Sequence, residues 1–402
     1  MEIFIARQPI FDLQQRVVGY ELLFRQYRDD LLAAESGEKA TARVIDAAVH
    51  DFGLLELTGG ARVFVNFPRG LLLQMAATLL PPEKTVVEIL ENVEPDGEVV
   101  SACRRLKSKG YRLALDDFVD HPRFEPLVEL ADIIKVDFLA AGPKERRRLV
   151  ERFAPRGIRL LAEKVESRED FRAGAALGYS YFQGFFFARP EILAGRNLPG
   201  RKLNCLRLLR ELHGPDYGFD RAEEILKKDV SLSFKLLRYV NSAWFGLKSP
   251  VSSLRRAMTV LGENGLRQWA TLVALSDLAT DSPPALFTTC LIRARFCELL
   301  AAPAGFASSR SELFLTGLFS ALDSLVGRPL PEVLAEIGVA SGVRSALLGE
   351  PGPFGELFGL VMAYERADWE GVLKKAALFR IDPALLPELY REALCWADRS
   401  AF

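Results

Sequence analysis

The chain has 402 residues, of which 49% are hydrophobic and 26% are charged. This composition is that of a globular protein, and the length favours two domains over a single core. With a net charge of -1, the chain gives no sign of a general nucleic-acid or membrane-surface binder, so we expect no direct nucleic-acid binding and no membrane association. We find no signal peptide and no apolar stretch of about 18 residues, which predicts a cytoplasmic protein. The five cysteines form no Cys-x-x-Cys pair, which argues against a zinc site.

Short apolar runs recur through the first 190 residues. Five of them are almost continuously hydrophobic, as expected of strands buried on both faces of a parallel sheet. These five cover residues 62–67, 85–90, 112–116, 132–136 and 158–163, and further candidate strands lie at 3–5, 17–23 and 181–182. Eight strands separated by helices predict a (β/α)8 TIM-like barrel over residues 1–190.

The stretches between these runs carry helix signals of their own. Residues 101–109 end at Gly110, a typical helix terminator. Ser167 followed by Asp170 resembles a capping box, which predicts a helix that closes near Gly178. The basic run 144–148 is interpreted as a solvated helix face.

A stretch rich in proline and glycine, residues 188–200, marks a domain boundary. We therefore expect a linker at 191–201 and a second domain at 202–402. The pattern of this second part is helical almost throughout, for example at 203–212, 222–245, 252–278 and 354–379. The predicted fold is an α/β barrel followed by an all-α domain.

Each predicted barrel strand ends in a polar residue. These residues are Glu21, Asn66, Glu88, Asp116, Asp117, Lys135, Glu163 and Gln183. The carboxyl ends of barrel strands converge on one mouth, where barrel enzymes carry their active sites. Two carboxylates ~4 Å apart repel by about 4 kcal/mol at an effective dielectric constant of 20, so a cation is expected among them. Oxygen ligands favour a hard ion such as Mg²⁺ or Mn²⁺, and two such ions could hold a phosphodiester. The alternative is that these acids only cap helices or face solvent.

The motifs around these residues resemble the EAL domain, a family of cyclic di-GMP phosphodiesterases. Residues 19–25, Gly-Tyr-Glu-Leu-Leu-Phe-Arg, are similar to the family signature with Leu22 in place of alanine, and 8–12 match the segment before it. The other motifs follow in order as Val65-Asn66-Phe67, Glu88-Ile89-Leu90-Glu91, Asp116-Asp117-Phe118, Lys135-Val136-Asp137, Glu163-Lys164-Val165-Glu166 and Gln183-Gly184-Phe185. The resemblance covers nearly all of residues 1–190.

The resemblance implies roles for the matching residues. Its metal ligands would be Glu21, Asn66, Glu88, Asp116 and Glu163, with Asp117 at a second divalent ion. Its catalytic residues would be Glu21, Lys135, Glu163 and Gln183, of which Lys135 and Gln183 position water and substrate. Gln8, Arg25 and Gln183 would bind the substrate, and Glu91 and Glu166 would anchor the loop after Asp117.

Two departures from the family pattern concern this site. The family continues Asp-Asp-Phe with a glycine- and serine-rich loop, whereas here Phe118 is followed by Val119-Asp120-His121-Pro122-Arg123 in a shorter loop. Valine and proline cannot adopt the backbone conformations that glycine can. In addition, Lys164 replaces a glycine of the family, and its ammonium could pair with a carboxylate of the site.

The helical half resembles the HDOD domain, which is similar to the HD phosphohydrolase fold without its metal ligands. The resemblance rests on 236–246, Leu-Leu-Arg-Tyr-Val-Asn-Ser-Ala-Trp-Phe-Gly, and on 251–257 and 260–262. No histidine follows His213, so a histidine-metal cluster is not expected there. Trp244 and Phe245 are interpreted as core residues, with an aromatic anchor for a protein partner as the alternative.

The order of the two domains resembles the EAL–HDOD signalling proteins. One reading is an enzyme that hydrolyses cyclic di-GMP to the linear dinucleotide, weakly or conditionally, with Mg²⁺ or Mn²⁺ as cofactor. The HDOD domain would then relay the state of the barrel to an unknown protein partner. The other reading is a catalytically inactive cyclic di-GMP receptor or a protein-interaction scaffold. The retained ligands favour the enzyme, and the altered loop favours the receptor. The resemblance also suggests a homodimer formed through the barrel.

Overall fold

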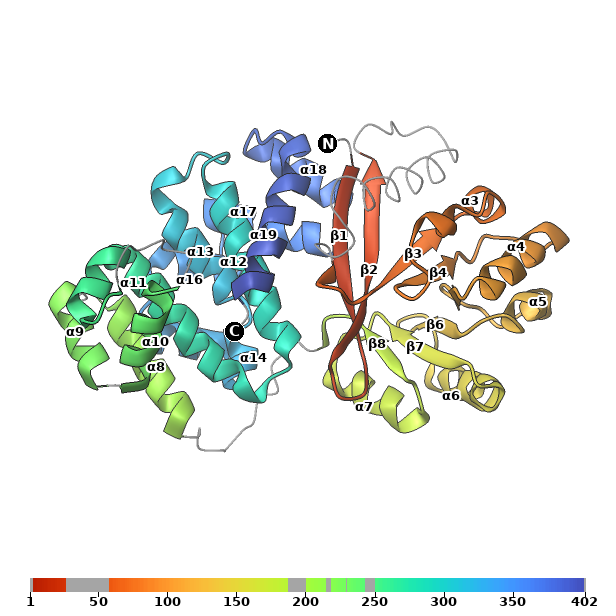
Figure 1. Cartoon of the computed structure of the whole chain (residues 1–402), viewed down its shortest axis with the longest axis horizontal. Helices are drawn as coiled ribbons and strands as arrows, with labels where there is room; N and C mark the ends of the chain where they lie inside the picture. Colours follow the sequence, from red (N-terminus) through yellow and green to blue (C-terminus); the bar gives the residue numbers. More distant parts are fainter. Residues whose placement is uncertain are drawn as a thin grey trace. The chain divides into compact units, whose positions relative to one another are not determined.

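A computed structural model describes residues 3–26, 58–186, 200–214, 218–228, 230–242 and 250–400 (Figure 1). Contacts divide the chain into two compact units. The barrel unit consists of Met1–Arg189, Pro303–Gly305 and Gly359–Ala401, and the helical unit consists mainly of Pro190–Ala302 and Phe306–Phe358. The domain limits expected from sequence remain a proposal, and most of the expected linker lies outside the described residues. The structure differs from that expectation in placing residues 359–401 with the barrel.

Eight strands form a closed barrel in sequence order. They are β1 Ile3–Phe11, β2 Val17–Gln26, β3 Arg62–Phe67, β4 Thr85–Ile89, β5 Arg112–Leu115, β6 Ile133–Asp137, β7 Arg159–Glu163 and β8 Tyr181–Gln183. The predicted barrel is therefore confirmed, and β1 and β2 are longer than the apolar runs that indicated them.

The first strand is a correction to the expected barrel, because β1 runs antiparallel to both of its neighbours, β2 and β8. All other neighbouring strands are parallel. The reason is the short connection after β1, since a parallel crossover needs a dozen residues or more. Here a tight turn joins β1 to β2, with the Asp12 carboxylate accepting hydrogen bonds from the main-chain N–H groups of Gln14 and Arg16.

Helices flank the barrel strands (Figure 1). They are α3 Arg69–Leu73, α4 Gly97–Ser108, α5 Glu125–Val128, α6 Pro143–Phe153 and α7 Arg168–Leu177. Helix α4 begins before the predicted residue 101 because Asp96 caps it, accepting from the N–H of Val99. The capping box before α7 is confirmed, since Ser167 accepts from the N–H of Asp170 and the helix ends at Gly178 with φ 109°.

An apolar layer fills the inside of the barrel. It consists of Ile10, Phe64, Val86, Ala114, Ile133 and Leu161, all of them buried. Successive side chains of a strand point to opposite faces, so the residue two positions further toward the mouth also points inward. In the same order of strands, these inward-pointing residues are Gln8, Asn66, Glu88, Asp116, Lys135 and Glu163. The strand register therefore places a polar layer directly above the apolar one.

The helical unit contains most of the remaining helices. They are α8 Gly200–His213, α9 Phe219–Lys228, α10 Val230–Val240, α11 Leu254–Leu278, α12 Pro284–Ala301, α13 Arg310–Leu318, α14 Leu322–Val326, α15 Leu330–Ile337 and α16 Ser341–Leu347. After them come α17 Pro353–Glu365, α18 Trp369–Leu378 and α19 Leu386–Ser400. The stretches expected at 222–245 and 354–379 are each divided between two helices. The second is interrupted at Ala367, which has a φ of 55°. Among the helices that the structure describes, none is long and apolar enough to cross a membrane.

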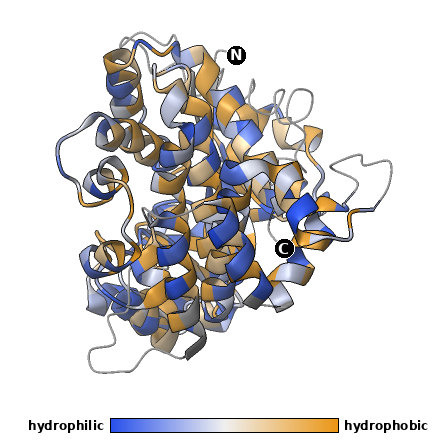
Figure 2. Cartoon of the chain, turned by 90° about the vertical axis from the view of Figure 1, so that its left-hand side faces the viewer, coloured by the Kyte–Doolittle hydropathy of each residue, from blue (hydrophilic) through white to orange (hydrophobic). Residues whose placement is uncertain are grey.

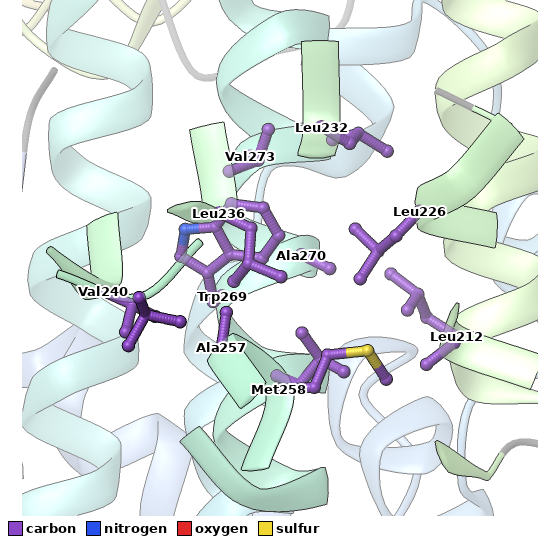
Figure 3. Close-up of a cluster of buried hydrophobic side chains, with 13 residues drawn as sticks. Leu212, Leu226, Leu232, Leu236, Val240, Ala257, Met258, Trp269, Ala270 and Val273 are labelled. Atoms are coloured by element: carbon purple, nitrogen blue, oxygen red, sulfur yellow. The ribbon is translucent and has the colours of Figure 1, made fainter. Parts of the chain in front are cut away.

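One hydrophobic cluster holds α8 to α11 together (Figure 3). Trp269 of α11 packs there with Leu236 and Val240 of α10 and Leu226 of α9. The helices carry both hydrophobic and hydrophilic residues (Figure 2), as expected when each buries one stripe. Trp244 and Phe245, for which a core position was predicted, lie outside the described residues.

Asn241 explains part of the HDOD-like motif. Its side-chain amide donates to the carbonyl groups of Leu237 and Val251, at 2.9 and 2.8 Å, and its Oδ1 accepts from the N–H of Val251 at 2.6 Å. The side chain thereby joins the end of α10 to the segment before α11. A residue with both a donor and an acceptor is required for this pair of bonds.

His213 at the end of α8 is a buried neutral histidine. Its ring meets Phe319 edge to face, with centroids 5.7 Å apart. Its Nε2 lies 3.1 Å from the hydroxyl oxygen of Thr271, and that hydroxyl donates its proton to the carbonyl of Arg267. Nε2 is therefore the protonated nitrogen and donates to Thr271. Burial, and secondly the positive charge of Arg267, lowers the pKa of His213 to about 4.

We expect the helical unit to lose stability as the pH falls from 6.5 to 4. The unfolded chain takes up a proton at the ordinary histidine pKa of 6.5, whereas the folded protein does so only near 4. The unfolded state thus binds more protons in this window. The free energy of unfolding is therefore lower below pH 4 than above pH 6.5, by about 3 kcal/mol. Chemical unfolding of wild type and His213→Gln between pH 7 and 4 measures this. If the stability of His213→Gln has the same pH dependence as that of wild type, His213 is not the group that takes up the proton.

Candidate active site

The polar layer at the barrel mouth is centred on Lys135. This side chain is fully buried, and its Nζ lies 2.7 Å from Glu88, 2.7 Å from Asp116, 3.0 Å from Glu163 and 3.4 Å from Glu21. The four acids come from β2, β4, the end of β5 and β7, and the lysine comes from β6. The predicted convergence of these strand-end residues on one mouth is therefore present in the structure.

Amide side chains hold Glu21 on its other sides. The amide nitrogen of Gln183 donates to Glu21 Oε2 at 2.6 Å and to Gln8 Oε1 at 3.0 Å. The amide of Asn66 donates to Glu21 Oε1 at 3.2 Å. Gly184 is required beside this network, because a Cβ at its φ of 142° would lie 2.2 Å from the carbonyl oxygen of Val165. This close approach packs the end of β8 against the segment after β7, where the N–H of Val165 donates to the carbonyl of Gln183 at 3.0 Å.

The cluster contains more negative than positive charge. Burial, and then the nearby Glu21, raises the pKa of Glu88 well above its ordinary value. Burial also raises the pKa of Glu163 to about 8, although Lys135 opposes this shift. Burial alone would lower the pKa of Lys135, but the surrounding carboxylates, Glu163 foremost, raise it well above its ordinary value. One ammonium therefore does not offset all the carboxyl groups around it, and without a further cation Glu88 and Glu163 are held toward their protonated forms.

The oxygen atoms of the cluster suit a hard divalent ion. Several of them are buried and make no hydrogen bond to a described residue, namely Oε2 of Glu88, Oε2 of Glu163, Oδ1 of Asn66, Oε1 of Gln183 and Oδ1 of Asp117, whereas Oε1 of Glu88 lies 2.7 Å from the ammonium of Lys135. Such orphaned oxygens need a cation or a donor. In the part of the chain that the structure describes, no three Asp, Glu, His or Cys side chains are arranged around one ion position. The ammonium of Lys135 stands between the acids instead.

Comparisons with known proteins cover both units. Residues 2–190 match the model of the EAL domain, and residues 198–344 match the model of the HDOD domain. The chain is 34% identical over 404 residues to the uncharacterized protein YuxH of Bacillus subtilis, with 98% of each chain covered. It is 35% identical over 372 residues to the cyclic di-GMP phosphodiesterase CdgJ of Vibrio cholerae, covering 92% of this chain and 86% of that one.

This chain belongs to the EAL–HDOD family. Among solved structures, the calcium and cyclic di-GMP complex of BlrP1 from Klebsiella pneumoniae matches with a TM-score of 0.40 and 23% identity, over 47% of this chain and 56% of that one. A second match is an EAL domain protein from Listeria monocytogenes, with a TM-score of 0.37 and 22% identity over 47% of this chain and 88% of that one.

The EAL domain of this chain separates Asp117 from the rest of the polar layer. Asp117 is 43% exposed, and its Oδ1 lies 3.6 Å from Nζ of Lys164, which also contacts Asp137 at 2.6 Å. Both Asp117 and Lys164 have positive φ values, of 38° and 53°. Lys164 thus keeps the left-handed backbone for which glycine is suited, and it adds a positive charge beside a predicted ligand of the second ion.

Three other expected site residues have less support. Arg25 belongs to β2, but its side chain lies outside the described part of the structure. Glu166 is exposed. Glu91 is exposed as well; it lines one pocket with Asp116, Asp117 and the first loop residues, Phe118 and Val119, but the structure gives it no hydrogen bond or ion pair with a described residue.

Asp120 anchors the loop after Asp117, a role that the sequence did not indicate. Its carboxylate is only 2% exposed, and it forms ion pairs with Arg148 at 3.0 Å and with Arg152 at 2.6 Å, both on α6. Arg152 also forms an ion pair with Glu125, at the start of α5. The basic run on α6 was interpreted as a solvated face, and Arg148 is indeed half-exposed, but it also holds the shortened loop. An acid in the loop and arginines four residues apart on a helix were the available signal.

We expect Asp120→Asn to loosen the loop after Asp117 without unfolding the barrel. The amide keeps the shape of the side chain but removes the charge that both arginines contact, so hydrogen exchange of residues 117–124 should become faster. Glu145→Gln is a matched control, because Glu145 also pairs with Arg148, at 2.7 Å, but lies outside the loop. Equal exchange of this loop in Asp120→Asn and wild type would show that Asp120 does not anchor it.

The HDOD unit has a cleft of its own, with a volume of about 300 Å³. It is lined by Lys235, Arg238, Tyr239, Ser242, Trp269, Val273 and Ser276. Lys235 is paired with Asp277 at 3.2 Å. Arg238 is exposed and has no acidic partner among the described residues. The rim of the cleft therefore carries positive charge above an aromatic floor.

Proposed function

We propose that the EAL barrel hydrolyses cyclic di-GMP to the linear dinucleotide with the help of two divalent ions, Mg²⁺ or Mn²⁺. The observation that carries this proposal is the ring of buried acids around Lys135, whose orphaned oxygens require positive charge. The similarity to a relative that is a cyclic di-GMP phosphodiesterase, over 92% of this chain, supports the choice of substrate.

The proposed roles follow the positions of the side chains. The first ion would be held by Glu21, Asn66, Glu88, Asp116 and Glu163, and the second would also use Asp117. When bound, such ions lower the pKa of a water molecule and stabilise the charge of the phosphodiester. Lys135 and Gln183 would orient water and substrate, and Gln8 and Arg25 would contact the substrate. Hydrolysis breaks one phosphodiester bond, and the water oxygen becomes part of the new phosphate monoester.

The proposed activity is weak or conditional, and the contact between Lys164 and Asp117 is the reason. The ammonium at 3.6 Å partly neutralises the carboxylate that the second ion would need. The same contact favours the second candidate function, a receptor that binds cyclic di-GMP without cleaving it. A neutralised Asp117 weakens the second ion more than it weakens contacts with the nucleotide.

One experiment distinguishes the two functions. The full-length protein is incubated with cyclic di-GMP and Mn²⁺ or Mg²⁺, the linear product is followed by chromatography, and binding is measured by calorimetry. Turnover that depends on the ion supports the enzyme. Binding without turnover, even at high protein concentration, supports the receptor. The absence of both would leave a protein-interaction scaffold and reject the cyclic di-GMP assignment.

We also propose that the HDOD unit relays the state of the barrel to a protein partner. The cleft lined by Tyr239, Trp269 and the exposed Arg238 offers that partner two aromatic rings and a positive charge that has no acidic partner among the described residues. Tyrosine, tryptophan and arginine are the residues that most often dominate protein interfaces.

A further inference from the structure

The C-terminal segment 359–401 lies beyond both family matches, which end at residues 190 and 344. It nevertheless belongs to the barrel unit. Its helices α18 and α19 come after the HDOD match, and α19 contacts β1. Neither family model therefore accounts for what this segment does.

The strand that the segment covers is only partly paired within the barrel. Among the described residues, β1 pairs with β2 along its whole length but with β8 only at Ile10 and Phe11. An unpaired strand edge is unfavourable unless another element covers it. The C-terminal segment does so: the Tyr390 hydroxyl makes a hydrogen bond with the main chain of Arg7, and the rings of Phe4 and Trp369 stack with centroids 5.3 Å apart.

The register of β1 and β2 connects this cover to the polar layer. Gln8 lies opposite Glu21, and both belong to the polar layer at the barrel mouth. Their chain neighbours Arg7 and Tyr20 therefore point to the opposite face. There the Arg7 guanidinium lies over the Tyr20 ring, 4.4 Å from its centroid, and ends 3.4 Å from the carboxylate of Asp398 on α19.

We propose that Asp398 is a positioning residue for the candidate active site, acting through Arg7 and Tyr20 on the strand pair that carries Gln8 and Glu21. This inference rests on the proposed function for the meaning of those two side chains. The Arg7 side chain is only 3% exposed and the Asp398 side chain 33%, so this ion pair leads from solvent to a guanidinium that water barely reaches. Loss of the carboxylate would force the strand pair to repack, and Glu21 would move with it.

The test uses the full-length protein and three variants. Asp398→Asn removes the charge, Asp398→Glu keeps it, and Glu370→Gln removes an exposed carboxylate from α18 as a matched control. In Asp398→Asn, hydrogen exchange should become faster in 3–11 and 17–26 but stay unchanged in 112–163. Its Mn²⁺ affinity, measured by calorimetry, should fall about tenfold, as for other residues that orient metal ligands. Asp398→Glu should recover most of the affinity, and Glu370→Gln should match wild type.

Two outcomes separate this inference from the proposed function. If Asp398→Asn matches wild type in both exchange and Mn²⁺ affinity, the positioning role is overturned and the proposed function stands. If wild type itself binds neither Mn²⁺ nor cyclic di-GMP, the proposed function fails, and the exchange of 3–11 and 17–26 still decides whether Asp398 holds the strands. Should Asp398→Asn fail to fold, Arg7→Lys, which keeps the charge but loses the planar contact with Tyr20, is expected to show the same pattern more weakly.

Discussion

Glu21→Ala is expected to abolish the hydrolysis of cyclic di-GMP. Glu21 accepts hydrogen bonds from Gln183 and Asn66 and lies 3.4 Å from Lys135, so its removal disorders three other side chains of the proposed site. It also takes away a proposed metal ligand, whose contribution to stabilising the transition state is several kcal/mol. We expect kcat to fall at least about a thousandfold, which corresponds to about 4 kcal/mol.

The measurement is product formation under saturating substrate and Mn²⁺, followed by chromatography. Glu83→Ala is a matched control because Glu83 is an exposed acid just before β4, outside the polar layer. It should retain the wild-type rate. If the wild type hydrolyses cyclic di-GMP and Glu21→Ala retains that rate, the proposed metal site is misplaced.

Lys135→Met should make the barrel strongly dependent on divalent ions for its stability. Lys135 is the ammonium between Glu21, Glu88, Asp116 and Glu163, and methionine leaves these four acids facing one another. Removing one partner from a buried ion pair typically costs about 3–5 kcal/mol. For a unit of this size, the melting temperature of the metal-free protein should fall by roughly 6–15 °C.

Mn²⁺ or Mg²⁺ should restore much of this loss, because the ion replaces the missing charge and binds the folded state alone. The rise in melting temperature on adding the ion should therefore be larger in Lys135→Met than in wild type. Lys109→Met, which removes an exposed lysine after α4, is the control and should show the wild-type response. An equal response in all three proteins would show that a divalent ion does not replace the charge of Lys135 among the acids.

The polar layer could be predicted from the sequence because strand geometry has a period of two. An apolar residue such as Val86 inside a barrel strand requires that Glu88 also point inward, and the same step leads from Ile133 to Lys135. The direction of β1 was not predicted, since strand propensity does not specify direction. Only the short connection around Asp12 excludes a parallel crossover.

Contacts between distant segments were beyond the sequence analysis. The pairing of Asp120 with Arg148 joins the loop after β5 to α6, the helix after β6; the acid and the arginines were visible in the sequence, but nothing in it indicated that they meet. The central position of Lys135 among the acids could not be predicted either, because the sequence indicated the acids and the lysine separately but not which group lies at the centre. The sequence of residues 359–401 indicates ordinary helices, and contacts such as Arg7 with Asp398 and Phe4 with Trp369 show that they belong with the barrel.

The division of the barrel unit into an early and a late part of the chain affects how the protein is made. Arg7 and Asp398 are 391 residues apart in the sequence. At a synthesis rate of about 5–20 residues per second, β1 waits roughly 20–80 s for the helix that covers its edge. During that time the ribosome-bound chain holds a strand with an open edge, which can pair with other chains. Synthesis of α19, and not completion of the eighth strand, is therefore the earliest point at which the barrel unit can finish folding.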